Sequence, residues 1–345
     1  MDTHNQSRRA RATNPLVSVV IPTRGRSEIV CRAVRSALDQ TFRSVEVIVV
    51  VDGEDPVTVR ALESLGDSRV QILALVESQG GSEARNIGVR AARGNWIAFL
   101  DDDDEWLPHK LEEQVRVGRS ETGQSVLITC RRFNREPGQP DEIAPWRLPW
   151  PNEDISEYMF CPSDGRRQTS GPQTSGYLGT RKLFFDLPFT PGLKCHQDWD
   201  WYLRAMRHES TVSRMLEEPL YIMHKERERP SMTQQARWET SLNWANSRKN
   251  LMTQRAFKSF LIHDCMYRCE ITRGRLWVFQ KLLAACRASG DLGIGDVLAA
   301  AKWYLFRPAL RLRLRGFTKR LRAVRSASFV NRTAAGRPRT QESQG

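Results

Sequence analysis

Short apolar runs and helical repeats alternate along the first part of the chain. Residues 17–21 and 45–51 are almost unbroken runs of β-branched residues, a pattern typical of strands buried on both faces. Between them, apolar side chains recur at helical spacing, and Ser27 stands where a side chain could cap the helix. The apolar positions of this helix are Ile29, Val30, Ala33, Val34, Ala37 and Leu38.

The alternation continues to about residue 120. The pattern predicts a short helix over 57–65, a strand over 70–76, a helix from a cap at Ser82 to 92, and a strand over 96–100. Strands that alternate with helices indicate a parallel sheet with crossover helices. Ligands of such sheets bind beyond the carboxyl ends of the strands.

Acidic residues follow two of these predicted strands. Asp52 comes directly after the second, and four consecutive aspartates, Asp101 to Asp104, come after the fourth. Carboxylates packed so closely repel one another, so the run makes sense where a hard cation such as Mg²⁺ or Mn²⁺ is bound. A solvated acidic loop that caps the helix after Pro108 explains the run equally well at this point.

The chain after residue 120 is less regular. Proline, glycine and tryptophan are spread through 137–172, as in long loops that cover a site. Helical patterning returns over 199–207 and 234–286. Residues 298–314 are both apolar and basic, which fits a helix on a membrane surface or, more commonly, an amphipathic helix packed on its own domain. Residues 1–15 and 326–345 have the composition of disordered tails.

The formal charge of +13 is concentrated toward the ends of the chain. Residues 307–325 contain eight Lys or Arg and no acid. Such a segment favours anionic partners, including membrane phospholipid, although positive ends also aid solubility. Seven cysteines without regular spacing favour a reducing compartment. No signal peptide and no run of roughly 18 apolar residues is present, so we expect a cytoplasmic protein.

Two common nucleotide-binding signatures are missing. The first predicted strand runs into Pro22-Thr-Arg24-Gly-Arg26 rather than a GxGxxG loop, and no Walker lysine motif occurs. The pattern therefore does not favour a dinucleotide-binding Rossmann domain or a P-loop enzyme.

Several ordered motifs resemble those of the family-2 glycosyltransferases. They are Ser18-Val-Val-Ile-Pro-Thr, Gln40-Thr-Phe, Val49-Val-Val-Asp-Gly, Ala84-Arg-Asn-Ile-Gly, Phe99-Leu-Asp-Asp-Asp-Asp with Trp106, Pro108, Lys110 and Leu111, and His196-Gln-Asp-Trp-Asp-Trp-Tyr-Leu-Arg. The resemblance is dense over residues 16–120 and resumes at 196–204.

The resemblance implies an α/β GT-A fold, in which a mostly parallel, Rossmann-like sheet is flanked by helices. Residues 16–225 would form the catalytic domain, with a nucleotide-sugar-binding half (16–120) and an acceptor half (121–225). A mainly helical C-terminal region would then occupy 226–325.

Residue roles follow from the same motifs. Asp52 would contact the nucleoside, and Pro22 and Arg24 would line the base pocket. Asp101 and Asp103 match the DxD positions, with Asp103 as the direct metal ligand and Asp102 as the variable middle residue that also faces the donor. Mg²⁺ or Mn²⁺ there would stabilise the charge that develops on the departing diphosphate. The role of Asp104 is open.

Asp198 is the candidate general base, which an inverting transfer needs to accept the proton of the acceptor hydroxyl. The family commonly has Glu before this residue, whereas Gln197 stands here. Without the resemblance, Asp198 could instead be a helix N-cap and Asp200 a surface partner of Arg204.

Three further side chains are weaker candidates. Trp199 and Trp201 flank Asp198 and would form an acceptor-side wall, although packing in the core explains Trp199 as well. His224 falls where some relatives place a residue that touches metal or diphosphate, but a lone histidine is more often structural.

The sequence thus predicts a metal-dependent, inverting glycosyltransferase of polysaccharide biosynthesis. It would move a sugar from a nucleotide donor, with UDP preferred, to a glycan, lipid or cell-surface precursor. The basic C-terminal segment would touch anionic membrane at its cytoplasmic face, and no nucleic acid is expected as a partner. The alternatives are a basic nucleic-acid-binding protein on an α/β core and a nucleotidyltransferase.

Overall fold

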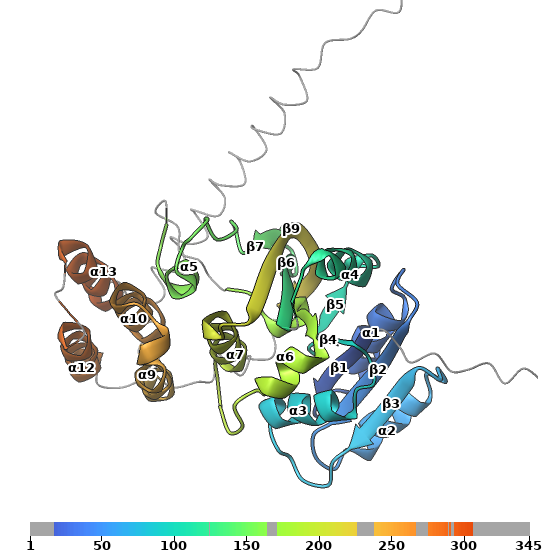
Figure 1. Ribbon diagram of the computed structural model, residues 1–345. Coiled ribbons are helices and arrows are strands. Elements are labelled where there is room, and N and C mark those ends of the chain that lie inside the picture. The colour runs from blue at the N-terminus through green and yellow to red at the C-terminus, as the bar shows by residue number, and fades with distance from the viewer. Residues whose placement is uncertain are drawn as a thin grey trace, which may run out of the picture.

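The computed structural model describes residues 17–123, 125–163, 171–225, 238–266, 275–288, 290 and 293–305. The two predicted tails, 1–15 and 326–345, lie outside these ranges, as does the basic segment 307–325. Figure 1 shows a sheet flanked by helices, with a group of C-terminal helices to one side of it.

The first half of the chain alternates strands and helices as predicted. Its elements are β1 (Val17–Thr23), α1 (Ser27–Leu38), β2 (Val45–Val51), α2 (Pro56–Glu63), β3 (Val70–Ala74), α3 (Gly81–Ala91), β4 (Trp96–Phe99), β5 (Asp104–Trp106) and α4 (Lys110–Ser120).

The second half completes the sheet and then becomes helical. Its elements are β6 (Ser125–Arg135), β7 (Glu142–Ala144), α5 (Ile155–Phe160), η1 (Thr174–Gly176), β8 (Leu178–Thr180), α6 (Arg181–Asp186), α7 (Gln197–Arg207), β9 (Thr211–His224), α9 (Trp238–Ser247), η2 (Lys249–Leu251), α10 (Gln254–Phe260), η3 (Leu261–Cys265), α12 (Arg275–Arg287) and α13 (Ile294–Leu305).

Within the described ranges the strands form one nine-stranded sheet. Its order is β3-β2-β1-β4-β8-β6-β9-β5, with β7 on the side of β6. β1 to β4 run parallel, β8 is antiparallel to β4, and β6 is antiparallel to β8. The expected α/β fold with a parallel core is therefore confirmed.

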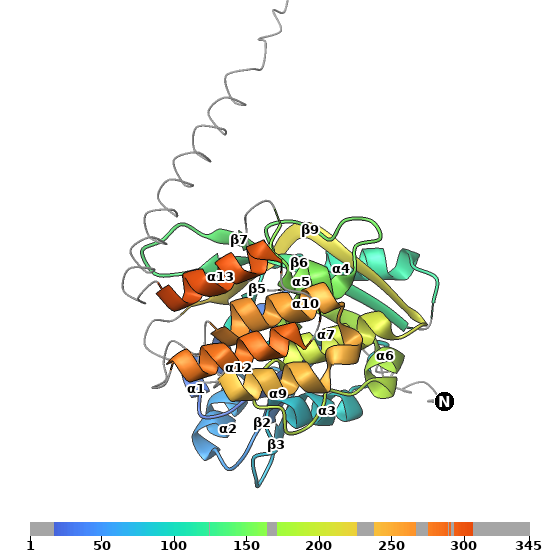
Figure 2. The ribbon, with the colours of Figure 1, turned by 90° about the vertical axis from the view of Figure 1, so that its left-hand side faces the viewer.

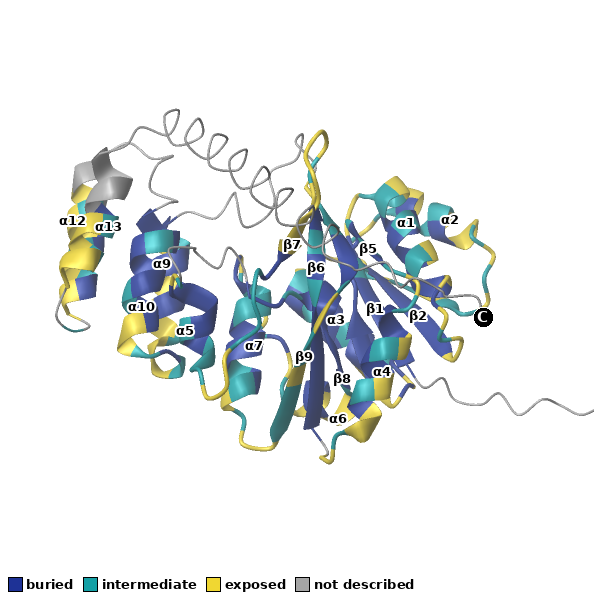
Figure 3. Ribbon diagram, turned by 90° about the horizontal axis from the view of Figure 1, so that it is seen from above, coloured by how far each residue is buried: buried dark blue, intermediate teal, exposed yellow. Residues whose placement is uncertain are grey.

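Alternate residues of the central strands face two hydrophobic clusters. On β1, Val17, Val19 and Ile21 pack with residues of α1 and α4, whereas Val20 packs with residues of α3, α6 and α7. Helices thus cover both faces of the sheet, and Figure 3 shows the strands buried between them.

Some predicted details are wrong. α1 begins at Ser27 itself, so this residue is not the cap, and the N-cap residue Arg26 makes no side-chain cap hydrogen bond. α3 begins before Ser82, after Gly80 with a positive φ of 84°. β3 ends two residues early, leaving Val76 86% exposed, and β4 ends at Phe99.

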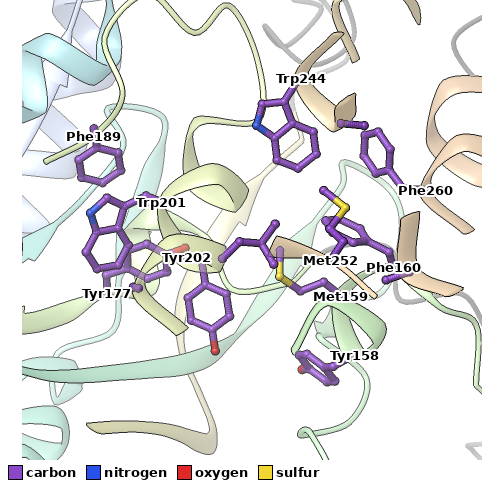
Figure 4. Close-up of a cluster of buried hydrophobic side chains, with 14 of the residues drawn as sticks. Tyr158, Met159, Phe160, Tyr177, Phe189, Trp201, Tyr202, Trp244, Met252 and Phe260 are labelled. Atoms are coloured by element: carbon purple, nitrogen blue, oxygen red, sulfur yellow. The ribbon is translucent and has the colours of Figure 1, made fainter. Parts of the chain in front are cut away.

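The C-terminal helices pack against α5 and α7 through a shared aromatic cluster. Trp238, Trp244 and Phe260 from these helices belong to the same buried cluster as Phe160 of α5 and Trp201 of α7. Figure 4 shows Trp244 and Phe260 on the side of this cluster opposite Phe189. Figure 2 shows α9, α10 and α12 lying side by side over this region.

Candidate active site

The acidic run lies where the parallel strands end. β4 ends at Phe99, and Asp101 to Asp104 follow at the same edge of the sheet as the carboxyl ends of β1 and β2. Thr23, the last residue of β1, donates a hydrogen bond from Oγ1 to Oδ2 of Asp102 at 2.7 Å. The run is not a helix cap, because the N-cap residue of α4 is His109.

Arg26 neutralises the middle of the run. Its Nη1 atom lies 2.7 Å from Oδ1 of Asp102 and 2.9 Å from Oδ2 of Asp103. Arg32 of α1 also donates from Nη2 to the backbone oxygen of Asp103 at 2.9 Å. One guanidinium thus bridges two carboxylates, as a cation at this place would.

Arg85 of α3 links the start of the run to the start of α7. Its Nη2 donates to Oδ1 of Asp101 at 2.5 Å, and its Nη1 donates to Oε1 of Gln197 at 3.0 Å. Thr174 adds a hydrogen bond from Oγ1 to Asp101 at 2.9 Å. These contacts bring the acidic run and the helix that carries Asp198 to one site.

Asp104 is the most deeply buried of the four acids. It is 3% exposed and accepts a hydrogen bond from the hydroxyl of Ser175 at 2.5 Å. The same hydroxyl oxygen accepts a hydrogen bond from the backbone N–H of Asp101 at 3.1 Å, so one serine orients two residues of the run. Asp104 is therefore a buried, structural member of the run.

Burial and mutual repulsion perturb these carboxyl groups. Burial first, and then the charge of Asp103, raise the pKa of Asp102 to about 6 despite the opposing effect of Arg26. Burial and the charge of Asp101 raise the pKa of Asp103, and burial raises that of Asp104 well above its usual value. Positive charge placed against the run would relieve this repulsion.

Asp52 orders the loop between β3 and α3. Its carboxylate accepts hydrogen bonds from the hydroxyl of Ser78 at 2.8 Å and from the backbone N–H groups of Gln79 at 2.6 Å and Gly80 at 3.0 Å. It is 6% exposed. In this structure Asp52 shapes the rim beside the strand ends.

Arg24 and Pro22 lie on the same rim. Arg24 is exposed, and its Nη1 donates to the hydroxyl of Ser78 at 3.0 Å, so Arg24 and Asp52 share Ser78 as a partner. Pro22 is half-buried at the end of β1. The three residues expected to hold the nucleoside thus gather around one loop.

Asp198 is the second residue of α7, and it is not the N-cap, which is His196. Burial raises the pKa of Asp198 to about 6, while a backbone hydrogen bond from Trp199 and the charge of Arg85 oppose this effect. Its backbone oxygen accepts a hydrogen bond from the hydroxyl of Tyr177 at 3.2 Å. A carboxyl group with this pKa is charged at neutral pH and can accept a proton.

The two tryptophans beside Asp198 differ. Trp201 is fully buried, its indole N–H donates to the backbone oxygen of Leu187 at 2.6 Å, and its ring stacks on Phe184. The structure therefore places Trp201 in the core, which corrects the expectation of an acceptor-side wall. Trp199 is half-buried and stacks on the ring of His196.

Asp200 does pair with Arg204, with Nε 3.0 Å from Oδ2, but the pair is not on the surface because Asp200 is fully buried. His224 pairs with Glu105, its Nε2 atom 3.1 Å from Oε2. Glu105 directly follows the acidic run, so His224 lies beside the strand that continues from the run.

The side chains at the acidic run show whether a metal ion would fit there. Among the described residues, no group of three or more His, Cys, Asp or Glu side chains is arranged to hold a metal ion. Asp101 and Asp103 have side chains that are 31% and 43% exposed, and their hard carboxylate oxygens suit Mg²⁺ or Mn²⁺. Of the described residues, Asp101 and Asp103 are the two candidate ligands, so the other ligands of an ion bound there would come from substrate and water.

Sequence reasoning assigned no role to Arg26, Arg85, Thr174 and Ser175. Arg26 and Arg85 stand inside two motifs noted above, Pro22 to Arg26 and Ala84-Arg-Asn. Because both motifs follow the predicted strands or open a predicted helix near the acidic run, their basic residues could have been predicted to pair with it. Thr174 and Ser175 are distant in sequence from the run and carry no local pattern that points to it.

The family model for glycosyl transferase family 2 matches residues 18–185. Residues 18–185 of the chain therefore resemble a glycosyl transferase family 2 domain. The match contains β1 to β5, the acidic run, Arg26 and Arg85, so it carries one side of the site described above. It gives no support to a nucleic-acid-binding protein or a nucleotidyltransferase in this part of the chain.

Curated relatives match the same part of the chain. The succinoglycan biosynthesis protein ExoO of Rhizobium meliloti is 39% identical over 101 residues, which cover 29% of each chain. The UDP-Glc:alpha-D-GlcNAc-diphosphoundecaprenol beta-1,3-glucosyltransferase WfaP of Escherichia coli is 32% identical over 106 residues, or 31% of this chain and 42% of WfaP. The matched stretches span less than half the length of these relatives.

A solved structure shares the fold of this chain. The mannosyltransferase PcManGT from Pyrobaculum calidifontis, in complex with GDP-Man and Mn²⁺, aligns with a TM-score of 0.52 and 16% identity over 86% of this chain and 82% of that one. This likeness confirms the expected GT-A fold. The alignment extends well beyond the residues of the family match.

Proposed function

We propose that the chain is an inverting glycosyltransferase in which Asp198 is the general base and the acidic run holds the donor's diphosphate. One observation carries this proposal. Arg85 bonds to Asp101 of the acidic run and to Gln197, the residue before Asp198. The donor-side acids and the base candidate are thus two parts of one site.

The donor is proposed to be a nucleotide sugar, with UDP as the nucleotide. The name of WfaP gives UDP-glucose as the donor of that relative. Here Asp52, Arg24 and Pro22 surround the loop at Ser78, at the edge of the sheet where nucleotides bind. We assign the nucleoside to this rim.

Mg²⁺ or Mn²⁺ is proposed to sit against Asp103 and Asp101. When bound, the ion would supply charge stabilisation for the leaving diphosphate. Asp103 is more exposed than Asp101, so it is the better placed of the two to face an added cation. His224 stays a minor candidate, because its Nε2 atom pairs with Glu105.

Asp198 is proposed to accept the proton of the acceptor hydroxyl while that oxygen attacks the anomeric carbon. The carboxylate accepts a hydrogen bond from the backbone N–H of Trp199, and the hydroxyl of Tyr177 donates to the backbone oxygen of Asp198. Trp199, which is half-buried, remains the candidate for an acceptor-side surface.

The acceptor is proposed to be a glycan or lipid-linked precursor, met at an anionic membrane surface. WfaP acts on a diphosphoundecaprenol-linked sugar by its name, and ExoO is named for succinoglycan biosynthesis. α13 exposes Ile294 (82%), Val297 (48%) and Leu298 (65%) at helical spacing, directly before the basic residues 307–325. No helix that the structure describes is long and apolar enough to cross a membrane.

Thermal-shift titration tests the donor. UDP-, GDP- and dTDP-sugars are added to the full chain with and without Mn²⁺, and we expect metal-dependent stabilisation by the UDP-sugars. Transfer is then measured from the stabilising donor to a polyprenyl-diphosphate sugar and to the same sugar without lipid. The proposal is wrong if no nucleotide sugar stabilises the chain and duplex DNA does so in a salt-sensitive way.

A further inference from the structure

Asp198 stands between two fully enclosed polar residues of the same helix start. His196, two residues before it, is 3% exposed, and Asp200, two residues after it, is 0% exposed. His196 has a positive φ of 60°, an uncommon conformation for a residue other than glycine. The backbone that presents Asp198 is therefore held in a shape that its neighbours must maintain.

Both flanking residues are held by α9, a helix some 40 positions further along the chain. The Nε2 atom of His196 lies 2.9 Å from the hydroxyl of Ser241, and its ring lies 4.7 Å from that of Trp244 between centroids. Oδ1 of Asp200 accepts hydrogen bonds from Nε1 of Trp244 at 3.2 Å and from Nε of Arg248 at 2.5 Å.

The remaining partners of Asp200 hold its other oxygen. Oδ2 accepts hydrogen bonds from the hydroxyl of Thr190 at 2.8 Å and from Nε of Arg204 at 3.0 Å. Burial alone would raise the pKa of Asp200, but the hydrogen bonds from Arg248 and Thr190 hold it below its usual value. Asp200 is thus a buried, charged anchor rather than a second base.

We propose that α9 is the positioning element of the active site, and that Ser241 and Arg248 fix the start of α7 so that Asp198 points at the acceptor hydroxyl. This inference rests on the proposed role of Asp198. It adds a function to the C-terminal helices, which lie beyond the residues of the family match. Ser241 and Arg248 are positioning residues, because their contacts are with His196 and Asp200.

A positioning role differs from plain packing in what it changes. If α9 only stabilises the fold, its variants lower stability but the molecules that stay folded turn over normally. If α9 sets the geometry of Asp198, kcat falls while donor binding at the other side of the site is kept. A displacement of about 1 Å in a catalytic group can slow a reaction by roughly a hundredfold.

The first experiment compares Arg248→Met with Arg255→Met. Arg255 of α10 pairs with Glu157 of α5, so it joins the same C-terminal helices to the catalytic side through a helix other than α7. We expect Arg248→Met to lower kcat roughly tenfold or more with an unchanged Kd for the donor, Arg248→Lys to restore part of the rate, and Arg255→Met to match the wild type. Equal kcat values in Arg248→Met and Arg255→Met would overturn the inference.

A second pair of variants, with smaller changes, tests the inference if Arg248→Met does not fold. Ser241→Ala removes only the partner of His196, and Ser259→Ala removes a comparable buried hydroxyl that donates to the backbone oxygen of Phe160. We expect kcat to fall in the first variant and not in the second. If wild-type protein transfers no sugar from any donor, the proposed function fails; if it does and Ser241→Ala is as fast as Ser259→Ala, only the positioning role fails.

Discussion

The Nη2 atom of Arg85 lies 2.5 Å from Oδ1 of Asp101, and the side chain of Arg85 is 10% exposed. The same guanidinium reaches Gln197 through Nη1, so a single buried cation from α3 joins the acidic run to α7. A glutamate at position 197 would compete with Asp101 for this arginine. Glutamine keeps the hydrogen bond and leaves the charge of Arg85 directed at Asp101 and Asp198.

The rate of transfer should depend on the charge of Asp198. A base must be deprotonated, and the pKa of Asp198 is about 6, so kcat should be level above pH 7 and fall about tenfold per unit well below pH 6. The positive charge of Arg85 lowers the pKa of Asp198, so Arg85→Gln should move the midpoint of the profile to higher pH. The measurement is kcat against pH at saturating donor and acceptor.

Arg90→Gln is the control for this profile. Arg90 lies on the same helix, but it pairs with Glu83 and its side chain is 55% exposed. A midpoint that moves equally in both variants, or that moves down in Arg85→Gln, would contradict the assignment.

Replacement of the base should separate chemistry from binding. We expect Asp198→Asn to lower kcat by roughly 10²- to 10⁴-fold, because the amide cannot accept the proton. The Kd for the donor should stay near the wild-type value, since the donor-side acids are untouched. Calorimetry gives the Kd, and a radiolabelled-sugar assay gives kcat.

Asp186→Asn, at an exposed site paired with Lys182, serves as the control. Turnover of Asp198→Asn within a few-fold of that control would refute the role of Asp198 as the base.

Divalent cation binding should respond in opposite ways to two substitutions. Arg26 places its charge against Asp102 and Asp103, where it opposes an added cation. Arg26→Gln should therefore bind Mn²⁺ more tightly than wild type without any donor, and Asp103→Asn more weakly. Titration followed by the electron paramagnetic resonance signal of free Mn²⁺ measures both. Arg69→Gln removes an arginine paired with Asp67 elsewhere and should change nothing; equal affinities in all variants would place the ion away from Asp103.

The fold could be predicted because its signals are local. The β-branched runs at 17–21 and 45–51 and the helical repeat before Leu38 specify strands and a helix in their own sequence, and the alternation specifies the parallel order. Helix starts were less predictable. Ser27 and Ser82 look like caps, but α1 begins at Ser27 itself and α3 begins at Gly81, after Gly80 with its positive φ.

The site was predictable only in part, because several of its contacts are remote in sequence. Asp52, Asp101 and Asp103 follow strands, so their edge of the sheet could be predicted from pattern. The link between the start of α7 and the acidic run depends on Arg85, 112 residues before Gln197 in the chain. The anchor of Asp200 depends on Arg248, and no spacing rule connects those two. Trp201 shows the converse: it lies next to the site in sequence yet points into the core.

Lys110 makes stability depend on pH in the alkaline range. It is 0% exposed, its Nζ donates to Oε1 of Gln114 at 2.6 Å, and burial lowers its pKa from 10.5 to about 8. Below pH 8 both states carry the charge, and the folded state is destabilised by about 3 kcal/mol relative to an unperturbed lysine. Above pH 8 the folded state loses its proton first, so this penalty fades as the pH approaches 10.5.

Lys110→Met should remove that dependence. Between pH 7.5 and 9.5 the free energy of unfolding of wild type should gain about 2 kcal/mol relative to the variant, from urea unfolding at both pH values. Lys182→Met, which removes an exposed lysine paired with Asp186, controls for the loss of a surface charge. A constant difference between wild type and Lys110→Met would show that the lysine is not held as described.

Gly88 lets α3 approach the central strand. A Cβ atom at this position would lie 2.3 Å from Cγ1 of Val20, a fully buried residue of β1. Gly88→Ala should therefore lower the free energy of unfolding by about 1–3 kcal/mol, although alanine favours helices, because the core around Val20 is closely packed.

Gly295→Ala is the matched control: Gly295 lies in α13 with nothing within 4 Å of an added Cβ, so the substitution should stabilise the protein by up to about 1 kcal/mol. Urea unfolding measures both variants, and a Gly88→Ala variant as stable as wild type would mean that α3 can shift on the sheet. Such a shift would also move Arg85, which is carried by the same helix, so in that case donor binding by Gly88→Ala should weaken although its stability is kept.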